Sequence, residues 1–165
     1  MSHCEKLNVL LELCESILQT DGTKIVIFTV WVEVIKMLLP YLRKVKNSAG
    51  KPIEDVAVFT GSNKQCGVGD REKEKARFIE DPNCRIMLGT VGALGVSHTL
   101  TCAQNVIHYQ LPYTYSDFCQ DEDRCHRKGT TSTVNSYTLL VKDSVDESVK
   151  DIVDGKYKLS EFMLN

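Results

Sequence analysis

The sequence of 165 residues has no apolar run long enough to span a lipid bilayer. A spanning helix needs roughly 18 consecutive apolar residues, and the longest run, Ile25 to Trp31, has the length of a strand. Glu5, Asn8 and Glu12 interrupt the N-terminal segment in which a signal peptide would need an apolar stretch. We therefore expect a soluble intracellular protein, cytoplasmic or nuclear, with no membrane partner.

The seven cysteines include no C-x-x-C pair. Structural zinc sites usually present two pairs of ligands whose members lie roughly two to four residues apart. The spacings from His98 to Cys102 and from Cys119 to Cys125 are only distant imitations of that pattern. We expect reduced, partly buried thiols, as in a reducing compartment, and no metal site.

An excess of one charge is also missing, since 20 Lys and Arg residues oppose 22 Asp and Glu residues, a net charge of −2. The distribution is uneven, because the stretch from Lys36 to Lys51 holds five basic residues and no acidic one. A second basic cluster contains Arg124, Arg127 and Lys128. Such stretches suit phosphate contacts, but they also occur as solvated faces, and the sequence leaves both interpretations open.

The usual nucleotide-binding motifs do not occur. No G-x-x-x-x-G-K-[ST] is present, because Gly50-Lys51 is followed by proline and Gly155-Lys156 lacks the upstream glycine. No G-x-G-x-x-G follows the first predicted strand, which disfavours a Rossmann-type enzyme. The chain thus has no P-loop of its own with which to bind a nucleotide triphosphate.

Strand-sized apolar runs alternate with helical patterns along most of the chain. The runs are continuous rather than alternating, which is typical of a sheet covered on both faces. This order predicts a single α/β domain with a parallel sheet and helices on both faces. We expect an N-terminal helix over 1–22 that packs on the domain, the domain itself over 23–153, and a tail over 154–165. The predicted strands are 24–29, 56–60, 84–88, 105–109 and 134–141, and the predicted helices are 3–19, 31–42, 70–80, 115–124 and 146–153.

The residues that follow three predicted strands are unusually small and polar. Thr29 ends the first strand, Thr60-Gly61-Ser62 follows the second, and Gly89 to Ser97 follows the third. Parallel sheets bind ligands beyond the carboxyl ends of their strands. Glycine and hydroxyl residues there allow backbone N–H groups to approach phosphates closely, although short turns need glycine for geometry as well.

A second candidate site lies in the stretch from Gln120 to Gly129. Arg124 and Arg127 are three residues apart, so on a helix they project to the same side. Two guanidinium groups on one side suit a polyphosphate that gains charge during transfer, and Asp123 could hold one of them. A surface cluster of ion pairs is the alternative.

Residues 24–153 resemble the second RecA-like domain of superfamily 2 helicases, most closely the Swi/Snf-type DNA translocases. The stretch from Gln120 to Gly129 matches the family's Q-x-x-D-R-x-H-R-x-G motif VI. Thr60-Gly61-Ser62, followed by Arg71 and Phe78, is similar to the family's glycine-hydroxyl turn and the helix after it. Residues 24–29 resemble motif IV, and residues 88–100 resemble motif V.

The resemblance implies one half of an ATP-driven motor. ATP and Mg²⁺ would be held mainly by a first RecA-like domain absent from this chain, which supplies the P-loop. In this chain Arg127 would be the arginine finger, Arg124 a second charge stabiliser, and Gln120 would position them, with Gly95 as a further nucleotide contact. Such a half is expected to be inactive alone. The resemblance also implies contacts to double- or single-stranded DNA from Thr29, Gly61, Ser62, Gly89 and Thr90.

Two other functions stay open at the level of sequence. One is a stand-alone nucleic-acid-binding module that kept the fold and lost the motor. The other is a mimic of a motor half that regulates an ATPase partner. Binding of DNA without any effect on an ATPase would favour the first, and capture of an intact helicase in excess DNA would favour the second.

Overall fold

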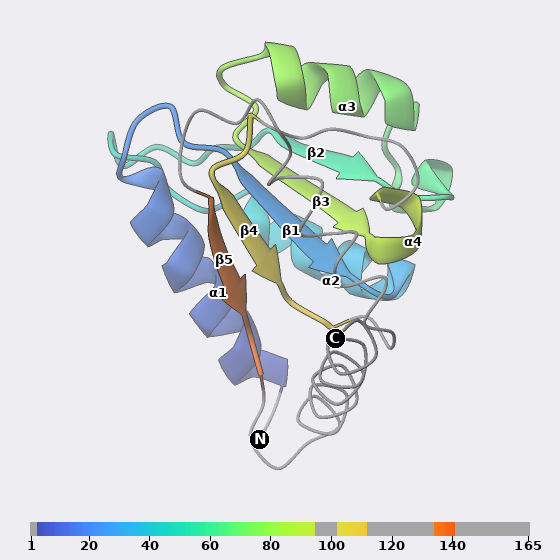
Figure 1. Ribbon diagram of the computed structural model, residues 1–165, viewed down its shortest axis with the longest axis horizontal. Helices are drawn as coiled ribbons and strands as arrows, with labels where there is room; N and C mark the ends of the chain where they lie inside the picture. Colours follow the sequence, from blue (N-terminus) through green and yellow to red (C-terminus); the bar gives the residue numbers. More distant parts are fainter. Residues whose placement is uncertain (1–2, 95–101, 112–133, 141–165) are drawn as a thin grey trace, which may run out of the picture.

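Five strands form one parallel sheet within the part of the chain that the computed structural model describes, residues 3–94, 102–111 and 134–140 (Figure 1). Their order across the sheet is β2-β3-β1-β4-β5, and every neighbouring pair is parallel. The predicted parallel α/β sheet is therefore confirmed. The strands are β1 (Ile25–Thr29), β2 (Val56–Phe59), β3 (Ile86–Thr90), β4 (Asn105–His108) and β5 (Asn135–Thr138).

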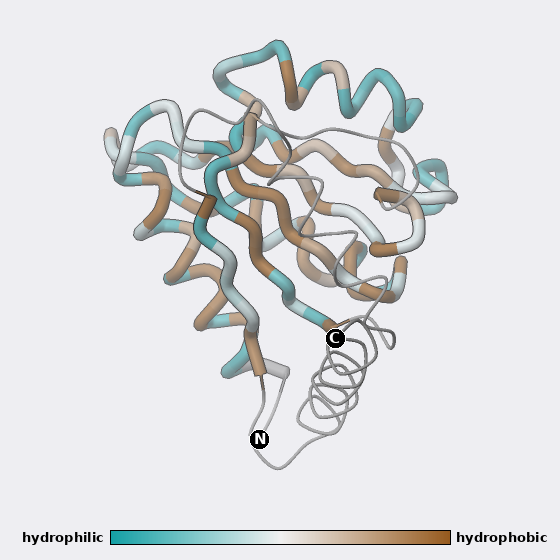
Figure 2. The backbone as a smooth tube through the Cα atoms, in the orientation of Figure 1, coloured by the Kyte–Doolittle hydropathy of each residue, from teal (hydrophilic) through white to brown (hydrophobic). Residues whose placement is uncertain are grey.

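Helices cover both faces of the sheet. Successive residues of a strand point to opposite faces, so an apolar strand presents apolar side chains on both faces for helices to cover. Ile25 and Ile27 of β1 pack in a core with α1 (His3–Leu18) and α2 (Val32–Leu42). Val26 and Phe28 pack on the other face, where α3 (Arg71–Glu80) and α4 (Val91–Leu94) contribute Phe78 and Leu94. Figure 2 shows the resulting apolar centre, with strongly hydrophobic residues along the inner strands.

α1 joins the first core through one apolar stripe. Leu7, Leu10, Cys14 and Leu18 recur at three- and four-residue spacings and are buried. The Arg85 side chain, at the start of β3, donates to the carbonyl oxygens of Leu18 (3.3 Å), Thr20 (2.7 Å) and Thr23 (2.9 Å). The Leu18 carbonyl is one that the end of α1 leaves unpaired, and the Thr20 and Thr23 carbonyls belong to the turn that follows the helix. The domain boundaries that the sequence predicts, after residue 22 and at residue 153, stay predictions.

Both ends of α3 are held by side chains. The Asp70 carboxylate accepts from the backbone N–H groups of Glu72 (3.0 Å) and Lys73 (3.4 Å), so Asp70 is the N-cap rather than the first helical residue. At the other end, the buried Lys24 ammonium donates to the carbonyls of Asp81 (3.0 Å) and Phe78. These contacts tie α3 to the beginning of β1.

The outer edge of β2 is covered by side chains from α3. The Val58 N–H donates to the Glu74 carboxylate (3.0 Å), and the Arg77 guanidinium donates to the Val56 carbonyl (3.5 Å). Arg77 also pairs with Glu74 (2.8 Å) and with Asp55. The Val58 N–H and the Val56 carbonyl of this edge strand are therefore occupied, which disfavours pairing with a further strand.

Two predicted loops contain short helices. The 3-10 helix η1 (Asn63–Cys66) lies within the segment 61–69, and β3 continues through Thr90 directly into α4. The strand lies two residues later than the predicted 84–88, because Gly89 still pairs with both Phe28 and Phe59. The predicted helices 115–124 and 146–153 and the tail 154–165 lie outside the described residues. No helix in the described ranges is long and apolar enough to cross a membrane.

Candidate nucleic-acid interface

The carboxyl edge of the sheet carries a threonine at the end of three adjacent strands. Thr29 of β1 and Thr90 of β3 are register partners. Phe59 of β2 is the register partner of Gly89. Thr60, the next residue, therefore lies beside Thr90. The sheet thus brings together residues from three of the segments that the sequence marked as phosphate contacts, and the arrowheads in Figure 1 all point toward this edge.

The predicted DNA-contact residues differ in accessibility. Thr29, Gly89 and Thr90 are buried, whereas Gly61 is exposed and Ser62 is half-buried. The Thr29 hydroxyl donates to the Trp31 carbonyl (3.5 Å) and so serves the turn between β1 and α2. Only the turn Gly61–Ser62 therefore offers accessible groups among these five residues.

Gly89 has a packing role at this edge. A Cβ atom at Gly89 would lie 2.3 Å from Leu94 Cδ1 and 2.8 Å from the Phe59 carbonyl oxygen. In contrast, a Cβ atom at Gly61 would meet nothing within 4 Å. Glycine is thus required at 89 for the approach of β2 and α4 to β3, while the absence of a side chain at 61 leaves open space for a ligand.

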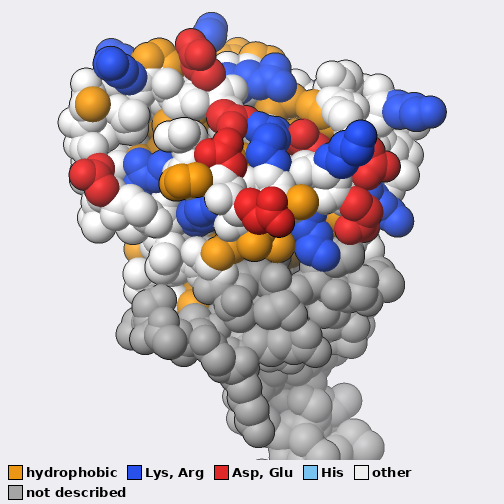
Figure 3. Space-filling model, turned by 90° about the horizontal axis from the view of Figure 1, so that it is seen from above, with side chains coloured by type: hydrophobic (Ala, Val, Ile, Leu, Met, Phe, Trp, Pro, Cys, Tyr) orange, Lys and Arg blue, Asp and Glu red, His pale blue; other side chains and the backbone are white. Residues whose placement is uncertain are grey.

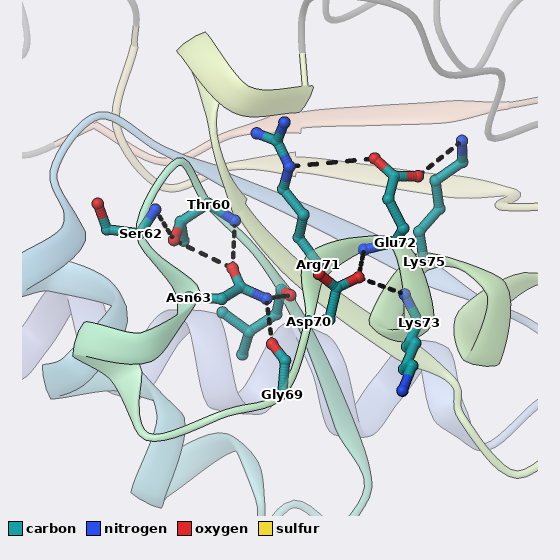
Figure 4. A network of polar contacts seen from close by, with 10 residues as sticks. Thr60, Ser62, Asn63, Gly69, Asp70, Arg71, Glu72, Lys73 and Lys75 are labelled. Atoms are coloured by element: carbon teal, nitrogen blue, oxygen red, sulfur yellow. Dashed lines mark hydrogen bonds and ion pairs between the residues drawn. The ribbon is translucent and has the colours of Figure 1, made fainter.

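Asn63 organises the loop that follows β2, although it is not among the site residues predicted from the sequence. Its side-chain oxygen accepts from the Thr60 N–H (2.7 Å) and hydroxyl (3.1 Å). Its amide group donates to the carbonyls of Val58 (2.8 Å) and Gly69 (3.0 Å). The Thr60 hydroxyl in turn accepts from the Ser62 N–H (3.0 Å), as Figure 4 shows. An asparagine directly after Gly61-Ser62, in a segment rich in turn residues, was the available signal.

The loop walls a pocket of about 560 Å³ between the end of β2 and the start of α3. Two cations line it, and the Asp70 carboxylate is already used as the helix cap. The Arg71 guanidinium lies 5.6 Å from the centroid of the Phe59 ring, and its side chain is 50% exposed. The pocket therefore combines open backbone with positive charge, an arrangement that suits phosphate groups. Its lining residues are Thr60, Gly61, Ser62, Asn63, Lys64, Gln65, Val68, Gly69, Asp70 and Arg71.

The basic stretch 36–51 is divided between the two ends of the sheet. Lys46 N–H donates to Glu15 (3.4 Å), and the Ser48 hydroxyl donates to Asp21 (2.6 Å), which precedes β1. The later part of this basic stretch therefore lies at the edge of the sheet where the strands begin, which we call the amino edge, away from the pocket. Lys36 of α2 lies near η1, where burial raises the pKa of the Cys66 thiol and the Lys36 charge opposes that rise.

The outer surface around α3 does not add a field of one sign. Figure 3 shows acidic and basic side chains interspersed there. Glu72 lies between Arg71 (4.0 Å) and Lys75 (3.9 Å). The Arg71 charge beside the pocket is therefore partly balanced by Glu72, and Lys64 is the other cation that lines the pocket. The predicted nucleotide-contact residues Gly95, Gln120, Arg124 and Arg127 lie outside the described residues.

Comparison with known families identifies the class. The model for the helicase conserved C-terminal domain matches residues 5–129, and the chain belongs to this family. The chain is 28% identical over 158 residues to the ATP-dependent helicase FUN30 of Saccharomyces cerevisiae and 26% identical over 148 residues to the human lymphoid-specific helicase. These alignments cover 96% and 90% of this chain, but only 13% and 16% of the two relatives.

A solved structure agrees with this assignment. The crystal structure of the C-terminal part of the Fun30 ATPase domain has a TM-score of 0.72 and 28% sequence identity to this chain. The match covers 90% of this chain and 44% of that one. The resemblance to the second RecA-like domain of Swi/Snf-type helicases is thereby confirmed, as is the RecA-like α/β fold.

Proposed function

We propose that this chain is the second motor domain of an ATP-dependent, Swi/Snf-like DNA translocase. Membership of the helicase C-terminal family supports the proposal, together with the likeness to FUN30 and the human lymphoid-specific helicase. The observation that carries it is the exposed Gly61–Ser62 turn beside Lys64 and Arg71, at the ligand-bearing edge of the sheet. An intracellular place of action, nuclear or cytoplasmic, belongs to the same proposal.

On this proposal the chain has two tasks. Motif VI supplies Arg127 as the arginine finger, Arg124 as a second charge and Gln120 to position them, with Gly95 as a further contact from motif V. These residues act on ATP and Mg²⁺ that a first RecA-like domain holds, because no P-loop occurs in this sequence. When bound, the nucleotide supplies the phosphoryl group whose transfer drives the motor.

The second task is to hold the phosphates of single- or double-stranded DNA. The Gly61–Ser62 turn is the accessible part of the predicted contact set, and Thr29, Gly89 and Thr90 are buried at the ends of β1 and β3, the two strands next in order across the sheet. Backbone and hydroxyl groups contact phosphates without selecting a base sequence. Binding is therefore expected to be indifferent to sequence and sensitive to salt.

The test is fluorescence anisotropy of the unmodified chain with labelled duplex and single-stranded DNA over a range of salt concentrations. Lys64→Ala and Arg71→Ala should each weaken binding and lower the slope of log K against log salt by about 1. Gly61→Ala should weaken binding without loss of stability, because its Cβ atom meets open space.

Lys44→Ala is the matched control for charge. Lys44 is exposed just beyond the C-terminal end of α2, at the amino edge, so its loss should leave affinity and slope close to those of the unmodified chain. Equal effects of Lys44→Ala and Lys64→Ala would contradict the assignment of the pocket. Strong preference for one DNA sequence, or an affinity that salt does not change, would contradict the proposed function.

A further inference from the structure

Asn63 is a buried residue, 7% exposed, that lies next to the proposed phosphate contacts without facing a ligand. A carboxamide offers two donors and two acceptor positions. All four are used here, by the Thr60 N–H and hydroxyl and by the carbonyls of Val58 and Gly69. No hydrogen-bonding capacity of the side chain is left for a phosphate, so any effect of Asn63 on binding must act through the loop.

The four bonds connect Asn63 to the strand before the loop, to the turn that begins the loop and to the end of the loop. Val58 belongs to β2, Thr60 begins the turn, and Gly69 comes directly before the cap of α3. Asn63 thus closes the loop at its base. From Thr60 the network continues outward, because the Thr60 hydroxyl accepts from the Ser62 N–H (3.0 Å). In Figure 4 the side chain of Ser62 points away from Asn63, toward the outside of this network.

We propose that Asn63 is a positioning residue that, through Thr60, fixes the Gly61–Ser62 turn in the shape that binds nucleic-acid phosphates. This inference rests on the proposed function of that turn. A turn held in its binding shape loses less conformational freedom when the ligand binds, which raises affinity without a new contact. A turn released from Asn63 must be ordered by the ligand instead, so binding weakens although Gly61 and Ser62 are still present.

The relay through Thr60 gives the inference its test. Asn63→Ala removes all four bonds, and Thr60→Val removes the hydroxyl that links Asn63 to the Ser62 N–H while keeping the shape of the side chain. Each variant should weaken DNA binding by up to about tenfold, which corresponds to the net contribution of one strong neutral hydrogen bond. Because both act on one relay, the double variant should bind about as weakly as either single variant, not as the product of two effects. Thr60→Ser keeps the hydroxyl and should bind almost as the unmodified chain does.

Arg85→Met is the control for general loss of stability. The Arg85 side chain also makes four hydrogen bonds, to Leu18, Thr20 and Thr23, but at the amino edge of the sheet. This variant should melt at a lower temperature and yet keep the DNA affinity of the unmodified chain. Hydrogen exchange at the Thr60 and Ser62 amides should accelerate in Asn63→Ala and stay slow in Arg85→Met.

The outcomes separate this inference from the proposed function. If Asn63→Ala lowers the melting temperature but binds DNA as tightly as the unmodified chain, Asn63 is structural only and the inference is wrong. Equal weakening by Arg85→Met, or additive effects of Asn63→Ala and Thr60→Val, would overturn it as well. If the unmodified chain itself binds neither duplex nor single-stranded DNA, the proposed function fails and the inference fails with it.

Discussion

Gly89 and Gly92 lie three residues apart but have different surroundings. A Cβ atom at Gly89 would be 2.3 Å from Leu94 Cδ1 and 2.8 Å from the Phe59 carbonyl, whereas one at Gly92 would meet nothing within 4 Å. Gly89→Ala should therefore lower the free energy of unfolding by about 1–3 kcal/mol, as overpacking does in a close-packed interior. Gly92→Ala, at an open position of α4, should be neutral or slightly stabilising. Thermal and urea unfolding of both variants check this prediction, and equal stability of the two would contradict it.

Cys14 offers a probe of α1 at the same scale. Its side chain is fully buried, and burial, with a smaller contribution from Glu15, raises the pKa of the Cys14 thiol to about 12. The thiolate is the reactive form. At pH 8 iodoacetamide should therefore modify the half-buried Cys66 in the native protein, and Cys14 only after unfolding. Peptide mass spectrometry over time measures both rates, and similar native rates would show that α1 leaves the core readily.

The same thiol gives a pH dependence with a defined sign. The pKa of Cys14 is raised from 9.0, so the folded state favours the neutral thiol. Its contribution to stability is complete below pH 9 and is lost as the pH rises from 9 toward 12, because only the unfolded chain releases the proton. The stability difference between the unmodified chain and Cys14→Ala should shrink over this range in urea unfolding.

At the scale of elements, the edge of β2 depends on the side chains of α3. Arg77→Ala removes the donor to the Val56 carbonyl and the pairs with Asp55 and Glu74. We expect a loss of about 1–3 kcal/mol in the free energy of unfolding, as for hydrogen bonds of charged groups. The exposed edge should also promote association of chains through β-pairing. Urea unfolding measures the loss of stability, and light scattering measures association. Lys73→Ala, at an exposed position of the same helix, is the control. An Arg77→Ala variant that stays monomeric would contradict the role of Arg77 in covering the edge of β2.

The strands β1 to β4 were predictable largely because their apolar runs are continuous, and α1 and α2 because their apolar residues recur at helical spacings. The 3-10 helix in the loop after β2 was not predictable, because a 3-10 helix and an open loop are formed by the same turn residues. What decides between them is the set of four bonds of Asn63, which depends on where Gly69 and Val58 lie. Within the site, the Gly61–Ser62 turn was predicted, but Thr29 and Thr90 proved to be buried, because pairing continues to the last residue of both strands.

At the scale of the whole molecule, the strand order explains why sequence spacing alone could not assemble the site. The neighbours β2, β3 and β1 come from separate parts of the chain, and the order β2-β3-β1 is not their order in the sequence. Periodicity finds strands but does not say which of them are adjacent. The order of the strands across the sheet is therefore a result of the structure alone.

The chain alone is expected to hydrolyse no ATP, with or without DNA, because the P-loop that provides most phosphate contacts is missing from this sequence. A phosphate-release assay of the purified chain checks this. DNA-stimulated turnover by the chain alone would contradict its assignment as one half of a motor.

Joined to a first RecA-like domain that carries a P-loop, the chain should support DNA-stimulated turnover that depends on Arg127. Arg127→Ala should lower that turnover by about 10³-fold or more, as for other arginine fingers. Arg127→Lys should also be severely impaired, since lysine keeps the charge but not the planar fork. Thermal melting and DNA binding should stay close to those of the unmodified protein. A loss of activity that only follows a loss of stability would contradict the assignment.

The central position of β1 has a consequence for the making of this protein. β1 is the first strand in the chain, but its two neighbours, β3 and β4, are both later segments. During synthesis on the ribosome, roughly 4–16 s pass between Ile25 and its partner Asn105 at ordinary elongation rates. Throughout that time β1, which is apolar except for Thr29, lacks at least one of its two neighbours. The helices α1 and α2, made before and directly after β1, can shield the face with Ile25 and Ile27 during this time, whereas the face with Val26 and Phe28 waits for Phe78 and Leu94.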